Sequence, residues 1–297
     1  MNIAIIGAGK VGSVLGRILT ENGERITAVV SRSLPAARAA GAFVHCKNVA
    51  TSLEAIPHDT TLLLIATPHS AVEEVARRLA TLEHLSFAKL AACHTSGMLT
   101  AQALSPLAER GATVFSFHPL QTFPRDLSPK EILPTARRIF FGVDGSPRAL
   151  AKAQQLARRL NSKTIVIPPE MRALYHAACV VASNHLTTLL WVLERMFEAL
   201  HTSERRFSPV FEPIIMATLR NVARTSPAEA LSGPVARGGV ETVAQHFDAL
   251  RSALPEVLPY FSALTAETTR LPEKKGSITS EQAGALYALI AAQSPTP

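Results

Sequence analysis

Three glycines near the start of the chain have the spacing that binds dinucleotides. The apolar run Ile3–Ile6 leads into Gly7, Gly9 and Gly12, which form the pattern G-x-G-x-x-G. The first glycine of this pattern makes a tight turn, the second lets the backbone approach a diphosphate, and the third lets the next helix pack against the strand. The amides and the positive dipole end of that helix then bind phosphate oxygens. We therefore expect a cofactor-binding turn made of Gly7, Ala8, Gly9, Lys10, Val11 and Gly12.

The residues after the second apolar run indicate which dinucleotide is bound. An NAD-specific site usually has Asp or Glu here, to accept hydrogen bonds from the ribose hydroxyls. In this chain Ile26–Val30 is followed by Ser31, Arg32 and Ser33. A guanidinium between two hydroxyls fits a 2′-phosphate, and such a charge-assisted contact contributes roughly 1.5–3 kcal/mol. The sequence therefore favours NADP, although a solvated surface arginine explains the same residues.

Polar residues also follow the next apolar runs, where an open α/β sheet binds its ligands. Thr67 and Pro68 come first, and we expect them to form a wall of the cofactor site; an ordinary turn is an equally good interpretation. His94, Ser96 and His118 follow, as candidates for hydrogen-bonding a carbonyl or exchanging its proton. Histidine titrates near neutral pH, which suits general acid work in hydride transfer. We predict a proton relay formed by His118 and Ser96, with Ser96 also close to the cofactor.

A helical stretch further along the chain carries a second set of polar residues. His176, Ser183 and Asn184 recur at helical spacing with Val180, Thr187 and Trp191, so they share one face of a helix that is otherwise apolar. We predict that His176 and Asn184 line the substrate site, with His176 as an alternative to Ser96 in the relay. Hydrogen bonding inside a helical core is the competing interpretation.

One arginine stands in a glycine-rich loop near the C-terminal end. The segment from Gly233 to Gly239 presents Arg237 after a proline and before two glycines. A guanidinium binds a carboxylate or phosphate through two parallel hydrogen bonds. We predict that Arg237 holds an anionic substrate; a solvated arginine in an interhelical turn is the alternative.

The elements that must position these residues are predicted by the apolar runs. Continuous apolar runs, rather than alternating ones, are typical of parallel strands that helices cover on both faces. They alternate with amphipathic segments up to about Pro168, which predicts an α/β fold with a doubly wound, mostly parallel Rossmann sheet. After Pro168 the pattern is helical, so we expect an NADP-binding domain over residues 1–168 and an all-α domain over residues 169–297. The expected strands are Ile3–Ile6, Ile26–Val30, Leu62–Ala66, Leu90–Cys93, Val114–Phe117, Ile139–Val143 and Thr164–Ile167.

Local signals predict where several helices begin and end. Ser70 to Glu73 has the spacing of a capping box, and Ser146 precedes a proline at a first helical position. Gly23, Gly41 and Gly111 stand where a helix would end in a left-handed residue.

The composition excludes several classes of protein. The chain has 297 residues, of which 47% are hydrophobic and 18% charged, so a disordered protein is excluded. Its net charge is +7, but the basic residues are scattered and only 5% of residues are aromatic, so we expect no nucleic acid partner. Three widely spaced cysteines predict neither disulfides nor a metal site. No apolar stretch of about 18 residues is uninterrupted, so we expect no membrane span and a cytoplasmic location.

Several segments together resemble one family. Besides the glycine turn, these are Thr67-Pro68, His94 to Gly97, Phe117 to Phe123, Tyr175 to Asn184, and Gly233 to Gly238. The chain resembles Rossmann-like oxidoreductases with a C-terminal domain of unknown function, related to pyrroline-5-carboxylate reductase and the β-hydroxyacid dehydrogenases. The resemblance implies an NAD(P) domain, a helical C-terminal domain, and a homodimer formed through the C-terminal helices.

Two departures from these relatives bear on the chemistry. β-Hydroxyacid dehydrogenases carry a catalytic lysine one turn before an asparagine, where this chain has Val180 before Asn184. The family follows its Arg-Gly pair with an acid, where this chain has Gly239. We expect an NADP-dependent oxidoreductase that moves hydride between nicotinamide and a small anionic carbonyl, imine or hydroxy compound. Because the lysine is missing, a non-catalytic dimer that senses NADP(H) is the alternative.

Overall fold

The chain folds into two compact units. The computed structural model describes residues 1–293, and its units divide between Asn184 and His185. The first unit therefore extends beyond the expected boundary at residue 168 and includes the helix that follows Pro168. This helix belongs to the first unit because Arg172 and Tyr175, in its first turn, hydrogen-bond to loops and strands of the sheet.

The first unit is built on one sheet, and its topology confirms the predicted doubly wound fold. The strand order is β3-β2-β1-β4-β5-β6-β7-β8, and every pairing is parallel except that of β6 with β7. Each of the predicted apolar runs forms a strand. The strands are β1 (Asn2–Ile6), β2 (Arg25–Val30), β3 (Val49–Ala50), β4 (Leu62–Ile65), β5 (Ala91–His94), β6 (Thr113–Pro119), β7 (Phe140–Gly145) and β8 (Lys163–Val166).

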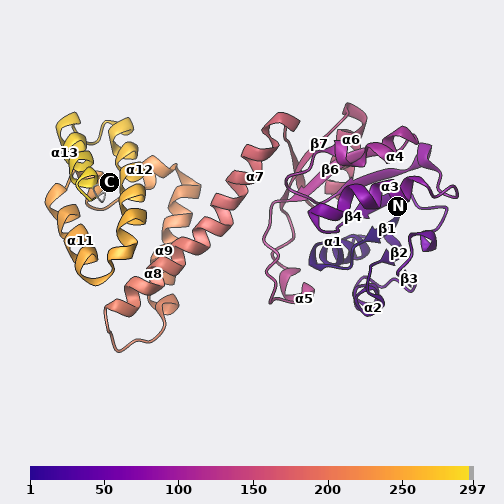
Figure 1. The fold of residues 1–297 in the computed structure, drawn as a ribbon, viewed down its shortest axis with the longest axis horizontal. Helices are drawn as coiled ribbons and strands as arrows, with labels where there is room; N and C mark the ends of the chain where they lie inside the picture. Colours follow the sequence, from indigo (N-terminus) through magenta and orange to yellow (C-terminus); the bar gives the residue numbers. More distant parts are fainter. Residues whose placement is uncertain (294–297) are drawn as a thin grey trace. The chain divides into compact units, whose positions relative to one another are not determined.

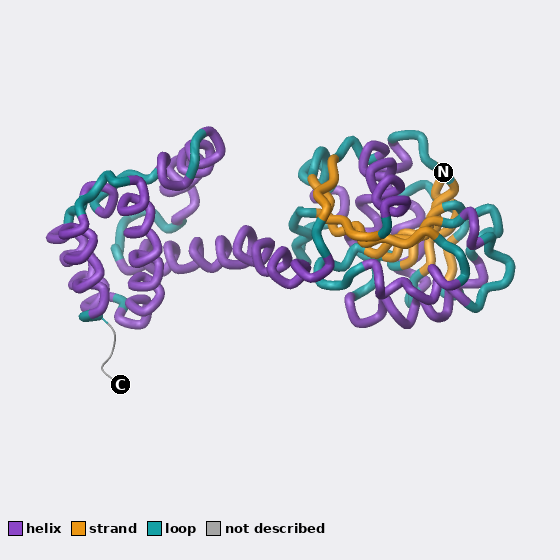
Figure 2. The backbone as a smooth tube through the Cα atoms, turned by 90° about the horizontal axis from the view of Figure 1, so that it is seen from above, coloured by secondary structure: helices purple, strands orange, loops and turns teal. Residues whose placement is uncertain are grey.

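Helices pack on both faces of this sheet (Figures 1 and 2). Side chains alternate along β1, so Ile5 points into one core with Leu15, while Ile6 points into another with Leu79. Burial on both faces is the reason that the strands read as continuous apolar runs. The helices of this unit are α1 (Lys10–Glu21), α2 (Leu34–Phe43), α3 (Val72–Ala80), α4 (Ser105–Glu109), α5 (Pro129–Ile132), α6 (Pro147–Arg159) and α7 (Arg172–Val180).

Three of the five predicted helix-terminal signals are confirmed. The Ser146 hydroxyl accepts a hydrogen bond from the Ala149 amide, 3.3 Å away, and Gly23 and Gly111 have φ values of 83° and 97°. The capping box at Ser70 is wrong, because Ser70 lies inside a 3₁₀ turn and α3 begins at Val72 without a side-chain cap.

Gly41 does not end a helix either. It lies within α2, where a Cβ atom would come 2.3 Å from Val49 Cγ1 and 2.8 Å from the Cys46 carbonyl oxygen. His45 takes the left-handed conformation instead, with φ 59°. Gly41 is therefore a packing glycine.

The second unit is helical, as predicted. A five-residue π-helical stretch, Val181–His185, separates α7 from α8. The helices that follow are α8 (Leu186–Ala199), α9 (Phe207–Arg224), α10 (Pro227–Ala230), α11 (Val240–Ala253), α12 (Leu258–Lys275) and α13 (Ser280–Ala291). Its core contains Phe247 from α11 and Leu286 from α13, each almost completely buried.

One stretch differs from the expectation about membranes. Within residues 1–293, Pro169–Ala199 is long and apolar enough to cross a membrane by length and composition, with a mean hydropathy of 1.3. One such helix is weak evidence for a membrane span, because other kinds of helix have the same length and composition.

Candidate functional site

The glycine turn has the geometry that its sequence predicts. Gly7 has φ 109°, and a Cβ atom there would lie 2.5 Å from the Ala66 carbonyl oxygen, so only glycine fits. A Cβ atom on Gly12 would lie 2.4 Å from the Gly7 carbonyl oxygen, which keeps α1 close to β1. By contrast, a Cβ atom on Gly9 would meet nothing within 4 Å. The absence of a side chain at Gly9 therefore leaves open space above the turn.

Helix α1 presents free amides to this space. Its first main-chain bond runs from the Ser13 amide to the Gly9 carbonyl oxygen, so the amides of Lys10, Val11 and Gly12 have no acceptor within the helix. The first turn carries no acidic residue and no side chain caps it. Both features leave the positive end of the helix available to an anion.

Lys10 lies beside this helix end but its charge is directed to a loop. The Lys10 ammonium donates to the Pro124 carbonyl oxygen at 2.6 Å and also to the Arg125 carbonyl oxygen. It therefore holds the connection between β6 and α5 next to the glycine turn. Ala8 and Val11, the other predicted turn residues, pack partly buried against the core.

The residues after β2 lie at the same edge of the sheet. The Ser31 amide donates to the Ala50 carbonyl oxygen, and the Ser33 hydroxyl caps α2 by accepting from the Ala36 amide at 3.5 Å. Arg32 is exposed, and no residue of the described chain forms an ion pair or hydrogen bond with its side chain. An exposed guanidinium at this place is free to meet a phosphate.

Thr67 has an unsatisfied hydroxyl beside the glycine turn. Its Oγ1 atom is buried without a hydrogen-bond partner among the described residues. A Cβ atom on Gly7 would lie 2.9 Å from the Thr67 amide nitrogen, so the Thr67-Pro68 segment and the turn are neighbours. A buried hydroxyl without a partner destabilises the protein by roughly 1–3 kcal/mol. Together with the free amides of α1, it fits a polar ligand that supplies the missing bonds.

His94 and Ser96 differ in what they can contribute. His94 is completely buried; its Nε2 atom lies 2.9 Å from the Thr100 carbonyl oxygen, and its Nδ1 atom accepts from the Ser96 amide. Both ring nitrogens are therefore occupied, and burial lowers the pKa of His94 to about 4. His94 is a structural residue. The Ser96 hydroxyl lies 3.1 Å from Nδ1 of His69, the residue that directly follows Pro68.

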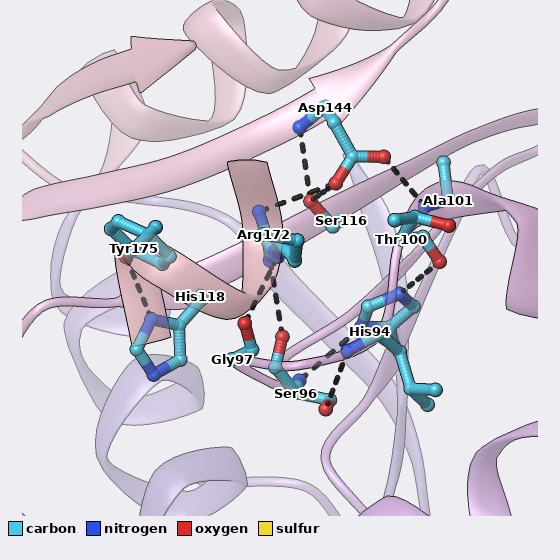
Figure 3. A network of polar contacts seen from close by, with 11 residues as sticks. His94, Ser96, Gly97, Thr100, Ala101, Ser116, His118, Asp144, Arg172 and Tyr175 are labelled. Carbon is cyan, nitrogen blue, oxygen red and sulfur yellow. Dashed lines mark hydrogen bonds and ion pairs between the residues drawn. The ribbon is translucent and has the colours of Figure 1, made fainter. Parts of the chain in front are cut away.

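His118 has one ring nitrogen occupied, and its other nitrogen has no hydrogen-bond partner among the described residues. Its Nδ1 atom lies 2.8 Å from the Tyr175 hydroxyl (Figure 3). Its Nε2 atom lies beside Gly97, where a Cβ atom would come within 2.9 Å of it. Burial, and then the charge of Arg172, lower the pKa of His118 to about 4. His118 is therefore neutral at neutral pH.

A pocket of about 440 Å³ is lined by His118 on one side and by the end of helix α7 on the other. His176, Ser183 and Asn184 line it, as does Val180 in the place of the missing lysine. The structure thus brings the predicted residues His118, His176 and Asn184 together. The remaining lining residues are Pro119, Leu120, Gln121, Thr122, Cys179 and Ala182.

A buried network of charged groups holds the segment Ser96-Gly97 beside this site. Its residues were not identified from the sequence. The guanidinium of Arg172, 2% exposed, donates to the carbonyl oxygens of Gly97 at 3.0 Å and Ser96 at 3.2 Å. Its Nη1 atom lies 3.2 Å from Asp144 Oδ2, without hydrogen-bond geometry. Asp144 also accepts from the Ala101 amide at 2.6 Å and the Ser116 hydroxyl at 2.5 Å. The signal that was missed is an acid within an apolar strand and an arginine at the start of an apolar helix.

Arg237 belongs to the second unit. It ends a 3₁₀ turn, Val235–Arg237, and Gly238 follows in the left-handed conformation with φ 68°. A Cβ atom on Gly238 would lie 2.6 Å from Gln282, which explains the glycine. The role of Arg237 as an anion clamp stays a prediction.

Two family models match the chain and together cover most of it. A Rossmann-like domain matches residues 1–119, and a domain of unknown function, DUF2520, matches residues 139–268. This pair of domains confirms the resemblance found in the sequence. A comparison with curated proteins finds no match.

Solved structures share the fold at low identity. TM1727 from Thermotoga maritima is 21% identical with a TM-score of 0.71, over 91% of this chain and 99% of that one. BF3122 from Bacteroides fragilis, named as a candidate NADP oxidoreductase, is 22% identical with a TM-score of 0.68, over 91% and 98%. A pyrroline-5-carboxylate reductase from Coxiella burnetii is 13% identical with a TM-score of 0.61, over 99% of both chains. These identities establish a shared fold and no more.

Proposed function

Because the chain joins a Rossmann-like domain to a DUF2520 domain, we propose that it is an NADP-dependent oxidoreductase. Its substrate is a small anionic carbonyl, imine or hydroxy compound. The similar folds include proteins named as a pyrroline-5-carboxylate reductase and as a reductive aminase in complex with NADPH. Both names describe a reduction, and the second also names NADPH as the bound cofactor. They support this class of reaction.

One observation carries the proposal: the first turn of α1 presents free amides beside the open space at Gly9, and the neighbouring Thr67 segment holds a buried hydroxyl without a partner among the described residues. Free amides at a helix end bind a diphosphate, and the Thr67 hydroxyl gains the partner it lacks. Arg32 supports NADP over NAD because it is exposed and unpaired at the end of β2 within the described chain. The bound dinucleotide supplies or receives hydride at its nicotinamide ring.

The side chains around the pocket orient the substrate and stabilise charge. His118 is neutral, so it polarises a carbonyl or imine by hydrogen bonding rather than as an imidazolium. His176 and Asn184 provide further polar contacts from the α7 side. Ser96 contacts His69, so it lies close to the Thr67-Pro68 segment that precedes His69.

Cofactor titration tests the proposal most directly. NADPH and NADH are titrated by calorimetry into the wild type and into Arg32→Ala. We expect tighter binding of NADPH, and a tenfold to hundredfold loss of that affinity in Arg32→Ala with NADH affinity unchanged, as a charged contact of roughly 1.5–3 kcal/mol implies. Absence of any dinucleotide binding refutes the proposal.

Turnover separates the enzyme from the sensing alternative. The lining of the pocket contains no lysine or carboxylate, and Val180 stands where related dehydrogenases have their lysine; this favours a sensor of NADP(H) as the second candidate. NADPH oxidation is followed with a panel of keto acids and cyclic imines. Turnover that His118→Ala abolishes supports the enzyme, and tight binding without turnover supports the sensor.

The proposal includes a homodimer formed through the C-terminal helices. An apolar groove of about 490 Å³ lies between α8, α9 and α12 within the second unit. Leu189, Ile214 and Leu264 line it and are 40% to 63% exposed in the single chain. A second copy would bury these side chains. Light scattering on Ile214→Glu, compared with wild type, tests this: we expect a dimer that becomes a monomer.

A further inference from the structure

His118, which lines the pocket, is held by a polar contact with Tyr175. The hydroxyl of Tyr175, in the first turn of α7, lies 2.8 Å from Nδ1 of His118 on β6, and the two rings are perpendicular. Gly142 on β7 makes room for this hydroxyl, because a Cβ atom there would lie 2.3 Å from it. Residues of α7, β6 and β7 therefore meet at this one hydrogen bond, whose two partners Figure 3 shows.

The direction of this hydrogen bond follows from the groups around it. Burial and the neighbouring Cys179 thiol raise the pKa of Tyr175, so the phenol keeps its single proton. A neutral imidazole nitrogen is a much better acceptor than a thiol sulfur. The Tyr175 hydroxyl therefore donates to Nδ1 of His118.

A neutral imidazole carries one proton, so its two nitrogens have opposite roles. The pKa of His118 is lowered to about 4 by burial, then by the charge of Arg172, and less by His176 and His94. Because Nδ1 accepts the hydrogen bond from Tyr175, the single proton of the ring is on Nε2. No described residue hydrogen-bonds to Nε2, which lies against Gly97, where a Cβ atom would come within 2.9 Å of it, and His118 lines the pocket.

We propose that Tyr175 is a positioning residue that holds His118 as the neutral tautomer with its proton on Nε2. The site beside Gly97 then always presents a hydrogen-bond donor. A donor there stabilises the negative charge that develops on a carbonyl oxygen or imine nitrogen as hydride reaches the neighbouring carbon, and solvent supplies the proton that completes the hydroxyl or amine. It selects substrates that bring an acceptor atom to this point. The assignment of a carbonyl or imine rests on the proposed function, whereas the tautomer does not.

Nitrogen-15 NMR tests the tautomer without any substrate. The full-length protein is labelled with ¹⁵N-histidine, and long-range ¹H–¹⁵N spectra are recorded at neutral pH; the signals lost in His118→Gln identify the ring. In the wild type we expect a protonated Nε2 and an unprotonated, hydrogen-bonded Nδ1. In Tyr175→Phe we expect the Nδ1 signal to move towards that of a free acceptor nitrogen. Gly142→Ala, which displaces the hydroxyl without removing it, should produce the same movement.

Tyr287→Phe is the matched control. The Tyr287 hydroxyl donates to Glu273 in the second unit, 2.8 Å away, so its loss should leave the signals of His118 unchanged. Wild-type protein with the proton on Nδ1 overturns the proposal, as do unchanged His118 signals in both Tyr175→Phe and Gly142→Ala.

A kinetic measurement links the tautomer to the reaction. With any substrate that the NADPH panel identifies, Tyr175→Phe should lower kcat about tenfold, the effect of one hydrogen bond, with a smaller change in KM and in NADPH affinity. If NADPH does not bind at all, the proposed function fails while the NMR result stands by itself. Unchanged kcat in Tyr175→Phe, in an enzyme that His118→Ala inactivates, refutes the catalytic part.

Discussion

Replacement of Arg172 by methionine would show how much the buried network contributes. Methionine keeps much of the length of the side chain but removes the charge and every donor. The guanidinium bonds to the Ser96 and Gly97 carbonyl oxygens and pairs with Asp144. Removing one partner of a buried ion pair typically costs about 3–5 kcal/mol, because the other charge is left buried. Asp144 still accepts from Ala101 and Ser116, so we expect the lower end, about 3 kcal/mol.

The loss should be concentrated in the segment that Arg172 holds. Native-state hydrogen exchange measures the local free energy of opening for the amides of Ser96 to Ala101, and urea unfolding measures the free energy of the first unit. We expect the exchange of these amides to accelerate more than that of β1 or β4. Arg195→Met is the control, because its ion pair with Glu256 is partly exposed and lies in the second unit.

A double variant decides whether charge is the reason. In Arg172→Met with Asp144→Asn, no uncompensated charge is buried, so the double variant should be more stable than the sum of the two single losses predicts. Strictly additive losses, or a loss below about 1 kcal/mol in Arg172→Met, would refute the argument.

Three further predictions follow from the site. Burial lowers the pKa of His94 from its ordinary value of 6.5 to about 4 in the folded chain, so the unfolded chain binds more protons between these values. His94 should therefore contribute about 3 kcal/mol to the loss of stability as pH drops from 6.5 to 4, in addition to the loss from His118, and urea unfolding at several pH values should show a correspondingly smaller pH dependence in His94→Gln. Gly9→Ala should leave the melting temperature unchanged, since a Cβ atom meets nothing there, yet weaken NADPH binding in a titration, whereas Gly7→Ala should lower the melting temperature as well. Thr67→Val should leave the cofactor-free protein as stable as wild type or slightly more stable, because the buried hydroxyl has no partner, and should weaken NADPH binding; a clear loss of stability without cofactor would show that the hydroxyl is already satisfied.

The sequence predicted the sheet well because its signal is local. Each longer strand contains a short apolar run, and only β3, with two residues, was too short to be recognised. The glycine turn was predictable for the same reason, since its roles depend on neighbours within a few residues. The predicted capping box at Ser70 was wrong because the chain forms a 3₁₀ turn there, so spacing alone did not place the start of the helix.

The support of the site was not predictable, because its contacts join distant segments. Arg172 reaches Ser96 and Gly97 across more than seventy residues, and Tyr175 reaches His118 across 57. Such contacts depend on the rotation of α7 about its axis and on the path of two loops, neither of which has a periodic signal. His94 illustrates the reverse case: its residue type suggested chemistry, but its complete burial and two occupied nitrogens make it structural.

The reversed direction of β7 has a consequence for how such proteins diverge. Because β7 runs antiparallel to β6, Pro119 pairs with Phe141, and the connection between the two strands begins and ends at the edge that holds the glycine turn. A parallel strand would have required the chain to cross to the opposite edge. This connection, which Lys10 fastens at Pro124, is consequently free to lengthen or shorten without rethreading the sheet. Changes in its length or sequence can alter the surface beside the glycine turn while the strand order stays the same.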